Sequence, residues 1–97
     1  MAFVQIMELS TSKPDALMEL DAQWRAASEG KRTLRRSIVA RDRNDTRRHV
    51  ILAFFDTFES AMENSELPET KEFAARFEEF TDGPLKFSDL DIIEDLT

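Results

Sequence analysis

The sequence has no cysteine and no tyrosine, and its 97 residues include only two glycines, three prolines, one tryptophan and one histidine. The absence of cysteine excludes disulfides, thiolate metal sites and cysteine nucleophiles. A single histidine excludes a metal site built from several histidines of one chain. The sequence therefore indicates neither a metal nor a cofactor. Few glycines and prolines beside 41% hydrophobic residues are typical of a folded chain rather than a disordered one.

Long apolar runs are also absent. No stretch approaches the ~18 apolar residues of a membrane span, and no basic segment followed by an apolar one opens the chain. We expect a cytoplasmic protein without a membrane partner. The length suits a single domain covering residues 1–97.

Charge is distributed unevenly along the chain. The net charge is −7, yet residues 31–48 hold eight basic and two acidic residues, a net charge of +6, and the remainder carries −13. The overall acidity argues against nucleic-acid binding, which needs a net basic face. Three interpretations of the basic segment stay open: pairing with acids of the same chain, contact with a second subunit, and an anion site. The acidic tail, Asp89, Asp91, Glu94 and Asp95, is one partner for such pairing.

Apolar periodicity predicts four strands and two helical regions. A helix begins at Ser12-Lys13-Pro14 and ends near Glu29, before Gly30. A second helical region begins at Thr57, breaks at Asn64-Ser65, resumes at Pro68 and ends near Phe80. Short runs rich in apolar residues predict strands at residues 2–9, 33–41, 48–55 and 86–95.

The resulting order, βαββαβ, is that of an α+β ferredoxin-like fold, a four-stranded antiparallel sheet with its helices on one face. Strands 2–9 and 48–55 carry apolar residues on both faces, whereas the helices can cover only one. A monomer rarely tolerates a large exposed apolar patch. We therefore expect a homodimer, the commonest closed assembly, and a higher assembly of dimers remains open.

With these features the chain resembles the dimeric α/β-barrel superfamily of antibiotic biosynthesis monooxygenase-like proteins. The resemblance covers the whole chain and depends on HVILAFFD at 49–56, FESAMENSELPETKEFAARF at 58–77 and DGPLKFSDLDIIED at 82–95. The segment 63–70 resembles a short bacterial subgroup without an assigned activity. The resemblance implies a dimeric barrel, in which two sheets pack face to face, and a cofactor-free monooxygenase activity.

The functional residues of such relatives have no counterparts by position. Haem-degrading relatives use an asparagine on the first strand, where this chain has Gln5, and a histidine in the second helical region. Here the only histidine, His49, lies on the third strand, and the only tryptophan, Trp24, lies on the first helix. Quinone-forming relatives use asparagine, tryptophan and arginine or tyrosine groups around their pocket, and this chain has no tyrosine.

His49 is the candidate catalytic residue, because histidine exchanges a proton readily near neutral pH. The alternative is that it pairs with an acid at a strand end. Six further residues are candidates for lining a ligand pocket. Gln5 and Arg36 each interrupt an apolar strand face and need a polar partner, since Arg36 shares its face with Leu34, Ile38 and Ala40. The others are Trp24, Phe54, Asn64 and Phe77, for which core packing or, for Asn64, a local cap is the alternative.

Two functions are compatible with these features of the sequence. The first is binding of a small apolar or aromatic metabolite, with cofactor-free oxygenation as its enzymatic form. The second is a homodimeric assembly or regulatory module whose pocket is filled by side chains. An open cavity on which polar groups converge would favour the first.

Overall fold

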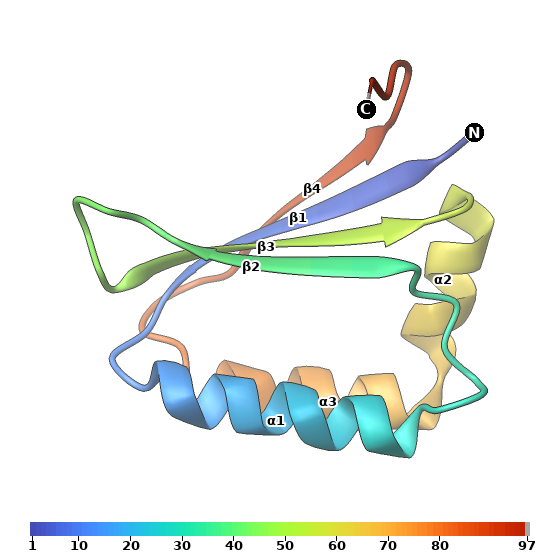
Figure 1. Ribbon diagram of the computed structural model, residues 1–97. Coiled ribbons are helices and arrows are strands. Elements are labelled where there is room, and N and C mark those ends of the chain that lie inside the picture. The colour runs from blue at the N-terminus through green and yellow to red at the C-terminus, as the bar shows by residue number, and fades with distance from the viewer. Residues whose placement is uncertain (97) are drawn as a thin grey trace.

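The computed structural model describes residues 1–96, which form an antiparallel sheet with helices on one side (Figure 1). The helices are α1 (Pro14–Ala27), α2 (Phe58–Glu66) and α3 (Pro68–Glu78). The strands lie in the order β2-β3-β1-β4 and are β1 (Phe3–Ser10), β2 (Arg36–Arg41), β3 (Arg48–Phe55) and β4 (Lys86–Asp91). This is the predicted ferredoxin-like fold, with its second helical region divided in two.

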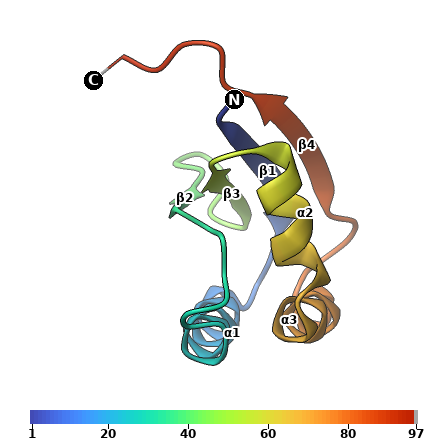
Figure 2. The same ribbon diagram turned by 90° about the vertical axis from the view of Figure 1, so that its right-hand side faces the viewer.

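The helices form a layer of their own. α1 and α3 lie side by side beneath the sheet, and α2 connects the sheet to α3 (Figure 2). α1 packs mainly against α3, whereas α2 packs against β3. Within residues 1–96 no helix has the length and apolar character needed to cross a membrane.

Strand register decides which side chains face the helices. β1 pairs with both β3 and β4, and Phe3 lies opposite Phe55. Phe3 and Phe55 are buried with Ala53 and Ala61 of α2, so this face is the inner one. Because side chains alternate along a strand, Val4, Ile6, Leu52 and Phe54 lie on the outer face, which no helix covers (Figure 2).

The second helical region breaks later than predicted. Leu67 is extended, with φ −61° and ψ 135°, and separates α2 from α3. Pro68 explains the position, because a proline disfavours helical geometry in the residue before it. Asn64, where the break was predicted, lies inside α2. The first helix ends at Ala27 rather than near Glu29, and the Ser28 hydroxyl donates to the Trp24 carbonyl there at 2.6 Å.

Two strands are shorter than predicted. β2 begins at Arg36 rather than residue 33, because Thr33 bonds to α2 instead of a strand: its hydroxyl donates to the Ser60 carbonyl at 2.6 Å. β4 ends at Asp91 rather than residue 95. The Ile92 amide still donates to the Ala2 carbonyl, but Ile93 and Leu96 beyond it are 89% and 84% exposed.

Candidate functional site

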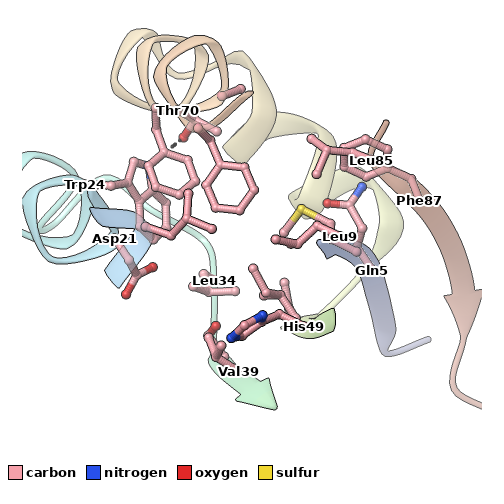
Figure 3. A pocket seen from close by; sticks show the side chains of 18 of the residues that line it. Gln5, Leu9, Asp21, Trp24, Leu34, Val39, His49, Thr70, Leu85 and Phe87 are labelled. Atoms are coloured by element: carbon pink, nitrogen blue, oxygen red, sulfur yellow. Dashed lines mark hydrogen bonds between the residues drawn. The ribbon is translucent and has the colours of Figure 1, made fainter. Parts of the chain in front are cut away.

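A cavity of about 590 Å³ lies between the inner face of the sheet and the helices α1 and α3. Figure 3 shows its walls, where Leu9, Leu34, Trp24 and Leu85 surround a common space. Most of its lining side chains are apolar. Five of the seven residues singled out from the sequence line it, namely Gln5, Trp24, His49, Asn64 and Phe77.

Two apolar clusters lie beside this cavity and contribute to its walls. One contains Phe3, Ala53, Phe55 and Ala61, where α2 meets the sheet. The other contains Leu9, Leu17 and Phe77, where β1, α1 and α3 meet. Together they hold the helical layer and the sheet in place on either side of the cavity.

His49 lies near the start of β3 with its side chain toward the cavity and is only 8% exposed. Its Nδ1 is 3.0 Å from the carbonyl oxygen of Arg47. A carbonyl oxygen only accepts, so this bond needs the ring hydrogen on Nδ1. In the neutral ring the other nitrogen, Nε2, is then left as a hydrogen-bond acceptor. His49 can therefore accept a proton from a bound molecule that reaches Nε2.

Trp24 is a fixed part of the cavity wall. Its indole Nε1 donates to the Thr70 hydroxyl at 3.0 Å, which joins α1 to α3 (Figure 3). Its ring is 5.9 Å from that of Phe73, centroid to centroid. On another side the guanidinium of Arg32 lies 5.9 Å from the indole centroid. These three contacts leave the ring little rotational freedom.

The two amide side chains of the site have different surroundings. Asn64 is 6% exposed, and its Oδ1 accepts the backbone N–H of Thr33 at 3.2 Å. It therefore holds the segment after α1 against α2 and is not the local cap considered from the sequence. Gln5, on the inner face of β1, donates from Nε2 to Asp89 Oδ1 at 3.2 Å, in an exposed bond between β1 and β4.

Arg36 and Phe54 do not line the cavity, so their prediction as pocket residues is corrected. They lie opposite each other in β2 and β3 on the outer face of the sheet. The Arg36 guanidinium lies 5.9 Å from the Phe54 ring centroid, a cation–π contact. Arg36 is exposed, and the group that it contacts is an aromatic ring of the same chain.

Ser37 and Arg41 of β2 also line the cavity, although the sequence pattern did not indicate them. Arg41 is the cross-strand partner of His49, and directly opposed side chains of antiparallel strands share a face. The register of the β2–β3 hairpin is the signal that would have found it. Asp21 of α1 and Thr70 of α3 also line the cavity and were not singled out.

Four of the eight cations of the basic segment form ion pairs with acids of the same chain. Arg47 binds Asp82 at 2.7 Å, and this hydrogen bond holds the pKa of Asp82 below its usual range. Arg48 binds both Glu8 and Asp42, at 2.7 and 3.2 Å. The pKa of Asp42 is lowered chiefly because its carboxylate accepts hydrogen bonds from the backbone amides of Asn44 and Asp45. The other pairs are Lys31 with Glu69 and Arg35 with Asp56.

The acidic tail takes no part in this pairing among the described residues. None of the ion pairs of the basic segment involves the acidic tail, whose pairing was one of the alternatives.

In residues 1–96 no three histidine, aspartate or glutamate side chains gather in a way that could hold a metal ion.

Comparison with known proteins gives matches in structure but not in sequence. No family model matches the chain, and no curated protein matches it. SnoaB, a cofactor-independent oxygenase from Streptomyces nogalater, superposes with a TM-score of 0.82 at 11% identity, over 98% of this chain and 96% of that one. Rv0793 from Mycobacterium tuberculosis gives 0.80 at 12% identity, over the whole of both chains.

A candidate antibiotic biosynthesis monooxygenase from Nitrosomonas europaea gives a TM-score of 0.79 at 17% identity, over 95% of this chain and 90% of that one. At such identities a likeness shows the fold. The chain has the antibiotic biosynthesis monooxygenase-like fold, and the resemblance seen in the sequence is confirmed at that level.

Proposed function

We propose that the cavity between the sheet and the helices binds a small, largely apolar molecule, with aromatic compounds as the favoured class. The observation that carries this proposal is the open volume of about 590 Å³, which falls within the range of ligand pockets, roughly 300–1,000 Å³. Apolar walls with a few polar groups, His49, Asn64 and Ser37 among them, are typical of such pockets. The competing function, a module with a side-chain-filled pocket, is disfavoured by the same volume.

Cofactor-independent oxygenation is a second candidate, favoured by His49. A base at Nε2 would take a proton from an electron-rich substrate, whose anion then reduces O₂ directly. Conversion of a CH₂ group and O₂ into a carbonyl and water balances without an added reductant. SnoaB, which shares the fold, is described as a cofactor-independent oxygenase. Replacing His49 by Ala should abolish O₂ consumption with a substrate once one is known, and unchanged turnover would remove this role.

The proposal includes a homodimer in which the outer face of one sheet packs on that of its partner. Apolar side chains of all four strands lie on this face, and Leu90 is 46% exposed. A second copy of the chain would remove this surface from water. Burial of apolar surface stabilises a complex by roughly 25 cal/mol per Å², from which the costs of association are subtracted. Native mass spectrometry tests it: a mass of two chains supports the dimer, and a monomer at micromolar concentration contradicts it.

Two neighbouring alanines of α3 provide a matched test of the cavity. Ala74 lines it and Ala75 does not, although both lie on an exposed part of the helix. In Ala74→Phe the ring enters the space that a ligand needs, whereas in Ala75→Phe it points elsewhere. The probe is N-phenyl-1-naphthylamine, an uncharged aromatic dye that becomes fluorescent in apolar surroundings.

We expect the dye to bind the unmodified protein and Ala75→Phe alike. Ala74→Phe should bind it about tenfold more weakly, equivalent to ~1.4 kcal/mol. Circular dichroism and thermal melting establish that both variants are folded. Equal binding by the two variants, or no binding by the unmodified protein, would contradict the proposal that this cavity holds the ligand.

A further inference from the structure

We propose that the ligand of this cavity is an aromatic anion, and that Arg41 binds its negatively charged group. This rests on the proposed function, because it assigns a ligand class to the same cavity.

Arg41 is the last residue of β2 and lines the cavity. It lies directly across from His49 of β3, which also lines the cavity. In such pairs the Cβ atoms are about 4.5–5.5 Å apart. The guanidinium and the imidazole therefore meet a bound molecule on the same side. The Ser37 hydroxyl lies on the same face of β2, since side chains four residues apart in a strand point the same way.

Arg41 differs from most other cations of the basic segment. Lys31, Arg35, Arg47 and Arg48 each have a carboxylate partner at 3.0 Å or less. Among residues 1–96 Arg41 has no ion pair, although its side chain adjoins an apolar space. A guanidinium presents five N–H donors in a planar fork that matches a carboxylate or sulfonate.

Three acids also line the cavity, Asp15, Asp21 and Glu78, and in the described part of the chain none of them forms an ion pair with Arg41. Asp21 of α1 is held by Arg25, with 3.0 Å between Nε and Oδ2. Asp15 lies in the first turn of α1, where the helix dipole favours a negative charge. The second cation of the lining, Lys71, is paired with Glu66 at 3.0 Å. Arg41 is thus the lining cation without a partner in the described part of the chain.

Two dyes that differ in charge test the inference. One is 8-anilinonaphthalene-1-sulfonate, an aromatic sulfonate, and the other is its uncharged analogue N-phenyl-1-naphthylamine. Fluorescence titrations compare the unmodified protein with Arg41→Gln and with the control Arg43→Gln. Arg43 belongs to the same hairpin, carries the same charge and is exposed as Arg41 is, but it does not line the cavity.

We expect Arg41→Gln to weaken sulfonate binding about tenfold, because hydrogen bonds to charged groups contribute at least that much. Binding of the neutral dye should stay within about twofold, and Arg43→Gln should change neither affinity. If the sulfonate binds Arg41→Gln as well as the unmodified protein, or if Arg43→Gln weakens it equally, the inference is wrong while the proposed function stands. If neither dye binds the unmodified protein, the proposed function fails as well.

Discussion

The hydrogen bond from Trp24 to Thr70 ties α1 to α3, and its removal should have a measurable cost. The bond is 3.0 Å long and partly buried, and Trp24 is only 7% exposed. Thr70→Val keeps the shape of the side chain but leaves the indole N–H without an acceptor. An unsatisfied buried donor costs about 1–3 kcal/mol, and the partial exposure of this bond places the expected loss near 1–2 kcal/mol.

A double-mutant cycle separates the bond from other effects of the substitutions. Trp24→Phe keeps an aromatic ring but removes the donor and part of the ring volume. It should lower the free energy of unfolding by about 1–3 kcal/mol. If the bond contributes as described, the double variant should lose about 0.5–1.5 kcal/mol less than the sum of the two single losses.

Urea unfolding followed by far-ultraviolet circular dichroism measures these energies. With a urea dependence of about 1–3 kcal/mol per M, a loss of 1 kcal/mol moves the midpoint by roughly 0.3–1 M. The protein concentration must be the same throughout, because a dimer's stability depends on it. The control is Thr46→Val, an exposed threonine in the β2–β3 turn, which should stay within about 0.5 kcal/mol. Strict additivity of Trp24→Phe and Thr70→Val would refute the reasoning.

Three further predictions concern the fold, the ion pairs and the dimer. Asn64→Ala removes the acceptor of the Thr33 amide and should lower the free energy of unfolding by about 1–2 kcal/mol in urea; an unchanged midpoint would contradict this. Asp82 has a lowered pKa in the folded state, so its pair with Arg47 stabilises the protein above the unfolded pKa of aspartate and is lost as pH falls through the folded value. Asp82→Asn should therefore lose less stability than the unmodified protein between pH 7 and about pH 2.5, and parallel losses in urea melts would count against the pair. Leu52→Asp places a charge on the outer face and should give a folded monomer in native mass spectrometry, whereas a persisting dimer would place the interface elsewhere.

The order of the elements was predictable because each has a strong local signal. The apolar runs at 2–9 and 48–55 and the turn at 82–84 depend on residues close together in the sequence. The helix break shows how two local signals compete. Asn64-Ser65 has the composition of a helix end, but Pro68 restricts the backbone of Leu67 directly, and the break follows the proline.

The position of Arg36 was not predictable in the same way. Leu34, Ile38 and Ala40 make its face of the strand apolar, which pointed to the interior. The sheet has two apolar faces, however, and hydrophobicity alone does not tell the inner from the outer one. The pairing of Arg41 with His49 decides it, since His49 faces the cavity. The bond between Asn64 and Thr33 was equally hidden, because it joins residues 31 positions apart.

The cavity itself could not be derived from the sequence, because a pocket wall and a packed core have the same residue pattern. Met7 and Ile51 lie on the inner face of the sheet, as core residues would, yet both line the open volume. The difference lies in the placement of the helices. α1 packs mainly against α3, and α2 contacts the sheet more extensively than α1 does, so the inner face is only partly covered by side chains. A ring added at Ala74 would occupy that remaining volume, and for this reason the comparison of Ala74→Phe with Ala75→Phe distinguishes a binding site from an incompletely filled core.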